Sequence, residues 1–346
     1  MGNKMSTGSA IIPEGVGSVV YDQQGMKHNH QIKSGSVHSQ RGGKPVNQDS
    51  AVLCQGYGSE EGILSGVFDG HGKKGHLVSK AIKTRLPLLL LDHKNKASSS
   101  HQLNCEDESD ESHLKDQSCS SPNRNRLLLQ WKEAFFNAFK QMDEEIKMVE
   151  KVDYSFSGST AVVALKQGND LLIANLGDSR AILGVRGENG VKAVQLTTEL
   201  KPGTPEEAKR IRRYNGRVFS LRDEPGVPRA WLPHAQSPGM AMSRSFGDLV
   251  MKHYGIISTP VITHHHITSN DLFILLATDG VWDVLSNEEV VSIVRGVEDE
   301  KMAAKAVVDA AVAAWKIKIP CDKRDDCTAV CYFLLKKDQT QAELVS

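Results

Sequence analysis

The strongest constraint on this chain is an apolar run that stops at an Asp-Gly-His-Gly sequence. Residues 62–68 are mostly apolar, Asp69 to Gly72 follow, and residues 77–91 then carry apolar side chains at helical spacing. This order predicts a buried strand, a sharp turn on two glycines and a helix. The rigid end of such a strand would hold Asp69 and His71 at the mouth of the turn. One Asp-Gly after a strand is, however, most often an ordinary turn.

The same arrangement recurs at four more places. Apolar runs at 171–176 and 272–278 lead into an acidic residue, and runs at 51–54 and 328–334 follow one. The acidic residues concerned are Asp49, Asp178, Asp279 and the pair Asp325–Asp326. Carboxylates gathered at one end of a sheet repel one another unless cations neutralise them. Oxygen ligands without His or Cys indicate a hard ion, so the pattern predicts a site for Mg²⁺ or Mn²⁺.

Seven short motifs follow one another in order along the chain. They are Asn47-Gln-Asp49, Val67-Phe-Asp-Gly-His-Gly72, Ser157-Gly-Ser-Thr160, Gly177-Asp-Ser-Arg180, Ala241-Met-Ser-Arg-Ser-Phe-Gly-Asp248, Ala277-Thr-Asp-Gly-Val-Trp-Asp283 and Asp325-Asp-Cys-Thr328. From about residue 32 to 335, the chain resembles the metal-dependent protein serine/threonine phosphatases of the PP2C (PPM) family, in its plant-type version. The resemblance implies hydrolysis of phosphoserine and phosphothreonine in proteins.

The resemblance also implies a centre with two Mg²⁺ or Mn²⁺ ions, which would activate a water molecule for attack on the phosphate. Asp69 would bridge the two ions, and His71 would protonate the leaving oxygen as a general acid. The remaining metal ligands that the resemblance implies are the Gly70 carbonyl, Asp279, Asp325 and, through water, Asp49, with Asp178 and Asp283 at a weaker third site.

Two residues depart from the family pattern. The family commonly has an Arg five residues before the first Asp, where it grips the substrate phosphate; here Lys44 offers a point charge but no bidentate fork. The residue before that Asp is commonly Glu, and here it is Gln48, which removes one negative charge from the outer metal shell. These departures keep open an alternative function, that of a catalytically weak relative that binds phosphoproteins.

The alternation of strands and helices predicts the fold class. From residue 157 successive apolar runs are joined by short Gly/Asn turns, which predicts antiparallel sheet. Residues 128–149 and 300–316 have helical spacing, and capping boxes at Thr204 and Ser286 indicate two more helix starts. The sequence predicts an α+β fold in which helices cover a β-sandwich. The resemblance implies a four-layer αββα sandwich, with two antiparallel β-sheets flanked by antiparallel helices.

The domain organisation follows from composition. We expect a flexible tail over residues 1–30, one phosphatase-like domain over 31–336 and a C-terminal tail over 337–346. Within the domain, the Ser- and Asp-rich residues 93–126 predict a disordered insertion. The resemblance makes the irregular stretch 214–240 a flap beside the catalytic cleft, where Trp231 and three basic residues are candidates for peptide contact. Those basic residues are Arg217, Arg222 and Arg229.

Charge and cysteine content restrict the partners. Basic and acidic residues both number 42, so the net charge is zero and the chain has no general attraction for nucleic acid. The six cysteines include no Cys-x-x-Cys pair, which favours a reducing compartment. We expect a cytoplasmic monomer, with a nuclear location left open. The resemblance implies that its substrates are phosphoproteins such as signalling proteins or kinases.

The N-terminus carries one candidate lipidation signal. Gly2 follows the initiator Met and Ser6 stands at the position that N-myristoylation requires, although so short a pattern also occurs by chance. A single acyl chain binds membranes weakly. We therefore expect peripheral, reversible association with the plasma membrane if Gly2 is lipidated.

Two other patterns are weaker. Residues 70–75 spell the glycine pattern of dinucleotide-binding folds, but Asp69 would place a carboxylate beside the pyrophosphate, and the chain continues in successive strands. The run His264–His266 lies in an alternating, strand-like segment without acidic neighbours, and we interpret it as a structural or surface feature.

Overall fold

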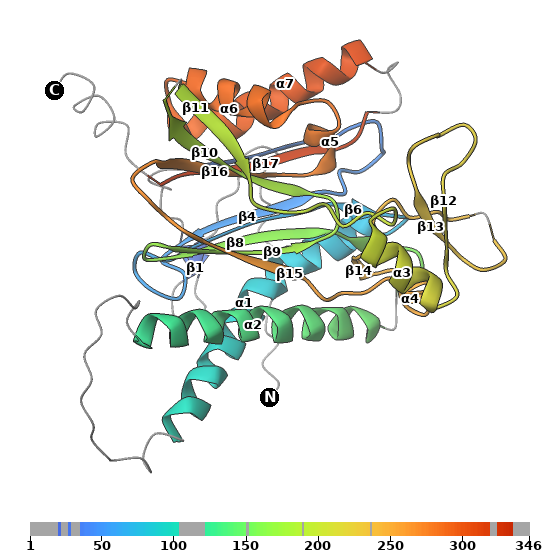
Figure 1. The fold of residues 1–346 in the computed structure, drawn as a ribbon, viewed down its shortest axis with the longest axis horizontal. Coiled ribbons are helices and arrows are strands. Elements are labelled where there is room, and N and C mark those ends of the chain that lie inside the picture. The colour runs from blue at the N-terminus through green and yellow to red at the C-terminus, as the bar shows by residue number, and fades with distance from the viewer. Residues whose placement is uncertain are drawn as a thin grey trace, which may run out of the picture.

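The computed structural model describes residues 20–21, 27–28, 35–103, 122–149, 152–188, 190–235, 237–318 and 324–334. Two five-stranded antiparallel sheets lie face to face at its centre (Figure 1). The first sheet has the order β11 (Gly190–Gln195), β10 (Arg180–Gly187), β16 (Asp271–Ala277), β17 (Cys327–Phe333) and β3 (Gly35–Gln40). The second has the order β15 (Val261–His266), β9 (Asp170–Leu176), β8 (Ala161–Gln167), β5 (Ile63–Phe68) and β4 (Ser50–Gln55).

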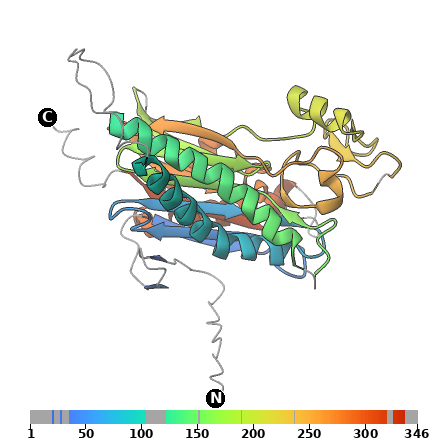
Figure 2. The ribbon, with the colours of Figure 1, turned by 90° about the horizontal axis from the view of Figure 1, so that it is seen from below.

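Helices cover the outer faces of both sheets. The long helices α1 (Gly75–Leu103) and α2 (Pro122–Lys147) lie side by side on the second sheet (Figure 2). The first sheet is covered by α6 (Asn287–Gly296) and α7 (Ala303–Lys318), which the short 3₁₀ helix η1 (Glu300–Met302) precedes. The predicted α+β class and four-layer αββα architecture are therefore confirmed.

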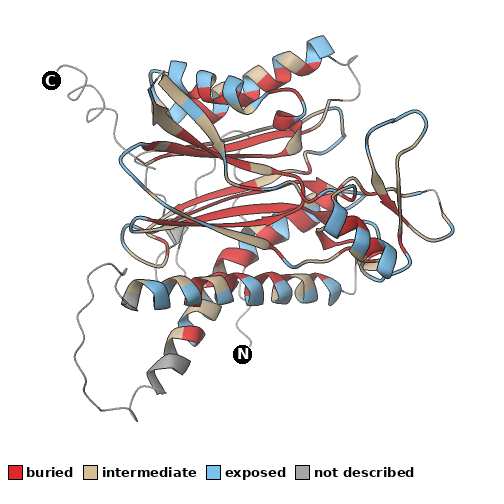
Figure 3. Cartoon of the chain, viewed as in Figure 1, coloured by how far each residue is buried: buried red, intermediate tan, exposed pale blue. Residues whose placement is uncertain are grey.

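The layers explain why the central strands have little polar alternation. Successive side chains of a strand point to opposite faces of its sheet. In β5, Val67 packs in the core between the two sheets, whereas its neighbour Phe68 packs under α1 and α2. Both faces are covered, so all six residues of β5 are buried (Figure 3). Such strands appear in the sequence as continuous apolar runs.

The prediction that residues 93–126 form a disordered insertion is wrong for the residues at both ends of this range, which are helical. Helix α1 continues to Leu103 and α2 begins at Pro122, so only residues 104–121 lie outside the described part of the chain. The added turns of α1 pack on α2: His93 Nε2 is 2.8 Å from Gln141 Oε1, and Lys94 Nζ lies 5.9 Å from the centroid of Trp131. The polar composition there marks the exposed side of a helix pair.

The predicted flap contains regular structure that the sequence analysis missed. Strands β12 (Arg217–Phe219) and β13 (Arg229–Trp231) form a hairpin that projects from one end of the sandwich (Figure 1). Trp231 is only 2% exposed, stacks on Phe219 with ring centroids 5.0 Å apart, and donates its indole N–H to the Phe219 carbonyl. Trp231 is thus the core of the flap and is not an exposed peptide contact.

The basic flap residues also differ from one another. Arg217 donates to the carbonyls of Leu232 and Ala235, which fixes the flap, and Arg229 forms an ion pair with Glu224. Arg222 is exposed. Of the three predicted peptide contacts, Arg222 is therefore the one that the fold presents most openly to solvent.

The remaining elements are short. Helices α3 (Pro205–Arg213) and α4 (Leu249–Lys252) lie next to the flap, and α5 (Asp279–Trp282) follows β16. The capping box at Ser286 is confirmed. The predicted helix start at Thr204 is also confirmed, because Thr204 is the N-cap of α3, but its side chain makes no capping hydrogen bond. Two further strands, β6 (Gly70–His71) and β14 (Phe246–Gly247), pair with β7 (Gly158–Ser159).

Both predicted tails lie almost wholly outside the described residues. Within residues 1–30, β1 (Val20–Tyr21) and β2 (Lys27–His28) form a short antiparallel ladder, so that part of the predicted flexible tail has regular structure. Gly2 and residues 337–346 are outside the described part. Among the described helices, none has the length and apolar character that crossing a membrane requires.

Candidate active site

The antiparallel registers bring the predicted carboxylates to one end of the sandwich. Ser50 of β4 is paired with Phe68 of β5, so Asp49 and Asp69 are neighbours at the edge of the second sheet. In the first sheet, β17 begins beside the end of β16, which places Asp325 next to Asp279. The two sheets meet where Thr278 Oγ1 donates to Asp49 Oδ2 at 2.8 Å.

The glycine turn has the geometry that the sequence predicts. Gly70 follows Asp69 at a point where a Cβ would clash with the carbonyl oxygens of Gln48 and Gly75. Gly72 has φ +77°, a left-handed conformation that side chains disfavour. The backbone can therefore turn tightly enough to leave the Asp69 carboxylate inside the site and His71 at its rim.

The loop before β4 is held by one carboxylate of the consecutive pair 325–326. Asp326 is buried and accepts hydrogen bonds from the backbone N–H groups of Gly42 (2.7 Å) and Gln48 (2.8 Å). The adjacent Asp325 instead accepts from Lys44 Nζ at 2.7 Å. Asp326 therefore shapes the loop, whereas Asp325 faces the site, as the resemblance implies when it names Asp325 alone as a metal ligand.

The buried carboxylates raise one another's pKa values. Burial raises the pKa of Asp49 to about 7, and the charges of Asp326 and Asp325 add to this effect. The pKa values of Asp69 and Asp279 lie well above the usual range because both groups are buried and surrounded by other carboxylates. Groups that are held in this way need a counter-charge to stay ionised at neutral pH.

The donor set fits a hard divalent cation. Asp49, Asp178 and Asp279 each have one buried Oδ1 atom without a hydrogen-bond partner among the described residues. Within the same residues, no three His, Cys, Asp or Glu side chains are placed so that they could hold one ion as they stand. Mg²⁺ usually takes one or two carboxylates and keeps several waters, so this open arrangement suits it better than a closed cage would.

Comparisons with known proteins decide the family. The family model "Protein phosphatase 2C" matches residues 47–316. The chain is 48% identical over 339 residues to probable protein phosphatase 2C 12 of Oryza sativa subsp. japonica, covering 92% of this chain and 87% of that protein. It is 49% identical over 307 residues to probable protein phosphatase 2C 72 of Arabidopsis thaliana, covering 88% and 86%.

The chain belongs to the protein phosphatase 2C family. Its fold agrees, because the crystal structure of serine-threonine phosphatase 2C from Toxoplasma gondii matches with a TM-score of 0.75 at 25% identity, over 88% of this chain and 96% of that one. The family carries out metal-dependent dephosphorylation of serine and threonine in proteins, and this PP2C chain is a protein serine/threonine phosphatase.

His71 has a partner that the sequence analysis missed. Its Nε2 lies 2.7 Å from Oδ2 of Asp248, which is 2% exposed. Burial works against the charged imidazole, but the charge and hydrogen bond of Asp248 together raise the pKa of His71. Asp248 ends the motif 241–248, so its presence was visible in the sequence, but its contact with a residue 177 positions away was not.

Asp178 and Asp283, the residues predicted to form a third metal site, lie next to the main carboxylate cluster and near the same Lys side chain. Burial raises the pKa of Asp178 to about 6, with Lys201 acting against it and the charges of Glu199 and Asp283 adding to it. Lys201 Nζ forms an ion pair with Glu199 at 2.7 Å. Its ammonium group thus supplies positive charge near Asp178 and Asp283, which the sequence analysis did not anticipate.

The histidine run has acidic neighbours after all. His264 Nε2 lies 2.8 Å from Asp170 and His265 Nε2 lies 2.9 Å from Asp271, so the expectation that the run has no acidic neighbours is wrong. Asp170 also accepts from Arg124 of α2. Because Asp170 starts β9 and Asp178 follows its end, this network lies at the opposite end of the strand from the carboxylate cluster.

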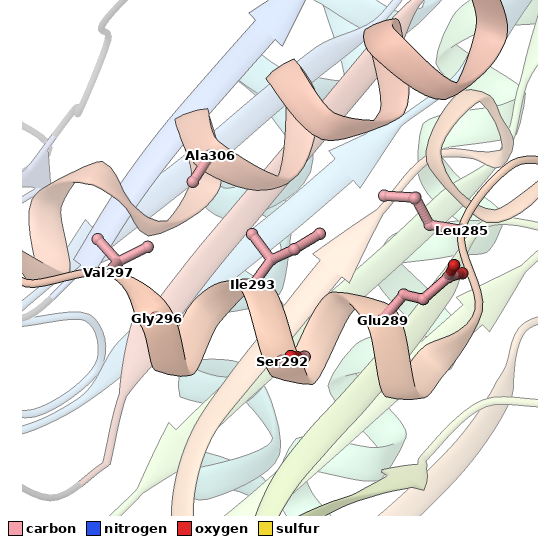
Figure 4. Close-up of a pocket in the computed structure, with 7 residues that line it drawn as sticks. All are labelled: Leu285, Glu289, Ser292, Ile293, Gly296, Val297 and Ala306. Carbon is pink, nitrogen blue, oxygen red and sulfur yellow. The ribbon is translucent and has the colours of Figure 1, made fainter. Parts of the chain in front are cut away.

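A hollow of about 510 Å³ on the surface is unrelated to this site. It lies between α6 and α7 and is lined mainly by apolar side chains (Figure 4). The lining residues are Leu285, Glu289, Ser292, Ile293, Gly296, Val297 and Ala306. None of the predicted site residues is among them.

Proposed function

We propose that the carboxylate cluster at the end of the sandwich binds two Mg²⁺ or Mn²⁺ ions and that phosphoserine and phosphothreonine are hydrolysed there. The observation that supports this proposal is the set of buried carboxylate oxygens without partners among the described residues, on groups whose pKa values are raised by burial and by one another. A protein gains nothing in stability from such a cluster unless cations bind to it.

The ligands would come from several strand ends. The side chains that would hold the ions are those of Asp49, Asp69, Asp279 and Asp325, together with the Gly70 carbonyl. The remaining pair, Asp178 and Asp283, would form a weaker third site. When bound, the ions supply a water of lowered pKa and neutralise charge on the phosphate.

The protein's own groups would act on the substrate. Lys44 Nζ lies 2.7 Å from Asp325. Burial lowers the pKa of Lys44, but the carboxylates of Asp325, Asp69 and Asp326 more than offset burial and hold this pKa above its usual value. Its ammonium group is therefore charged and placed to attract a phosphate. His71 would give a proton to the departing serine or threonine oxygen.

The test is phosphate release from a phosphoserine peptide by the purified protein. Activity should rise with added Mn²⁺ or Mg²⁺ and disappear with EDTA. A folded protein that releases no phosphate at saturating metal would contradict the proposal. The Lys44–Asp325 ion pair occupies one expected metal ligand, so that outcome would favour the alternative of a weak relative that binds phosphoproteins.

We also propose that Gly2 is myristoylated and that the protein associates peripherally with the plasma membrane as a monomer in the cytoplasm. Only the sequence from Gly2 to Ser6 supports this proposal. The expected substrates are phosphoproteins of signalling, including kinases.

A further inference from the structure

We propose that Asp248 is a positioning residue that fixes the tautomer and orientation of His71, so that Nδ1 is the nitrogen that protonates the leaving oxygen. This inference rests on the proposed function and assigns atoms to one of its steps. Three independent features of the fold support it.

The first feature is the hydrogen-bond arrangement of the imidazole. A carboxylate only accepts hydrogen bonds, so Nε2 of His71 must carry the proton that it shares with Asp248 Oδ2 at 2.7 Å. The other nitrogen, Nδ1, is buried and has no hydrogen-bond partner among the described residues. Because Nδ1 has no partner in the described part of the chain, it is the ring nitrogen that can form a hydrogen bond to a substrate oxygen.

The second feature is the backbone at Asp248. Its φ of +50° and ψ of +47° are left-handed, which is uncommon for a residue other than glycine. Such conformations persist where the surrounding structure enforces them, and they gather at functional sites. The enforcing contacts are present here: Asp248 N donates to the Ser157 carbonyl, and Ser245 Oγ donates to Asp248 Oδ2 at 2.6 Å.

The third feature is the path between the two side chains. His71 of β6 and Gly247 of β14 are both paired with Gly158 of the strand β7 that separates them. A Cβ at Gly158 would clash with Asp248 Oδ2. The glycine therefore leaves the space through which the carboxylate reaches the imidazole.

The step balances in atoms and electrons. Oxygen of the attacking water forms a bond to phosphorus, and the bond between phosphorus and the serine oxygen breaks with its electron pair on that oxygen. One proton of the water stays on the phosphate product and the other passes to solvent. The serine oxygen takes the proton from Nδ1 of the imidazolium. The neutral imidazole keeps its other proton on Nε2, in the hydrogen bond to Asp248, and recovers the lost proton from solvent.

The decisive variant is Asp248→Asn, because Asn has the same shape and tolerates the left-handed conformation. It replaces an obligate acceptor by an amide that can turn its NH₂ toward Nε2 and select the wrong tautomer. We expect kcat on a phosphoserine peptide to fall at least about tenfold. With 4-nitrophenyl phosphate, whose leaving group departs without a proton, kcat should stay within about threefold of wild type.

Asp143→Asn is the matched control. Asp143 Oδ1 accepts from the Gly247 N–H at 2.9 Å, so it supports the same turn without touching His71. This variant should change both rates by the same factor. In a His71→Gln background, Asp248→Asn should lower the peptide rate by less than about twofold, because the two residues act as one unit.

A measurement on the unaltered protein removes any dependence on how the variants fold. Nitrogen-15 NMR of the neutral His71 ring should show the proton on Nε2. A proton on Nδ1, equal losses on both substrates in Asp248→Asn, or a full additional loss in the His71→Gln background would overturn the proposal. Wild-type protein without metal-dependent activity on either substrate would instead contradict the proposed function.

Discussion

In the metal-free protein, Asp49→Asn should increase stability, although it removes a group from the active site. Burial and the neighbouring carboxylates raise the pKa of Asp49 from 3.8 to about 7. At about 1.4 kcal/mol per pKa unit, the ionised group destabilises the metal-free fold by up to about 4 kcal/mol. Relaxation and water entry reduce this value, so we expect a gain of about 2 kcal/mol for the uncharged, isosteric Asn.

The sign of the pH dependence follows from the raised pKa. A carboxyl of this kind favours the folded state fully below its unfolded pKa of 3.8, and this contribution is lost as the pH rises through about 7. The difference in stability between the Asp49→Asn variant and the wild-type protein should therefore be small near pH 4, grow up to about pH 7 and stay constant above it.

The assay is urea unfolding in EDTA at several pH values, repeated with Mg²⁺. Mg²⁺ at about 100 times its Kd would stabilise the wild-type protein by about 3 kcal/mol. The wild-type protein would then be more stable than the Asp49→Asn variant. Asp326→Asn is the control: both of its carboxylate oxygens accept backbone N–H groups, so it should lower stability by about 2 kcal/mol with or without Mg²⁺. An Asp49→Asn protein less stable than wild type in EDTA near pH 8 would refute the reasoning.

Three further predictions concern other parts of the molecule. Asp69→Asn should abolish phosphate release while leaving the circular dichroism spectrum unchanged, and undiminished activity would contradict the proposal that Asp69 is a metal ligand. Glu207→Gln should lower stability by about 3 kcal/mol, since it leaves Arg210 and Arg244 without their buried partner. Burial opposes ionisation of Glu207, but its ion pairs outweigh burial and lower its pKa to about 2; the wild-type advantage over this variant should therefore shrink in urea titrations as the pH falls from about 4.5 toward 2. Gly2→Ala should release any membrane-bound fraction of the full chain, and identical fractionation of variant and wild type would exclude acylation at this site.

Much of the architecture could be predicted from local patterns. Residues 62–68 and 171–176 were expected to be strands, and β5 and β9 lie there, since strands buried on both faces must be apolar throughout. The capping box at Ser286 marks a helix start because both of its hydrogen bonds join residues only three positions apart. Signals of this kind depend on neighbours in the sequence.

Predictions that rested on composition alone were less successful. Residues 93–103 were predicted to be disordered, yet α1 continues to Leu103, and α2 offers His93 a partner that no local pattern describes. Trp231 looked like an exposed contact, yet it packs on Phe219 within a hairpin. His264 contacts Asp170 at the start of β9 because the two strands pair, and His265 contacts Asp271 at the start of β16 because the chain turns there.

Short motifs and apolar periodicity were enough to indicate the family resemblance, a β-sandwich covered by helices and acidic residues at strand ends, because each of these patterns lies in a short run of consecutive residues. Which of these groups contact one another depends on how the chain folds. The sheet registers place Asp49 beside Asp69, the loop packing gives Asp325 and Asp326 different tasks, and Gly158 lets Asp248 reach His71. Such contacts join residues far apart in the chain, and their geometry depends on packing, which a linear pattern does not contain.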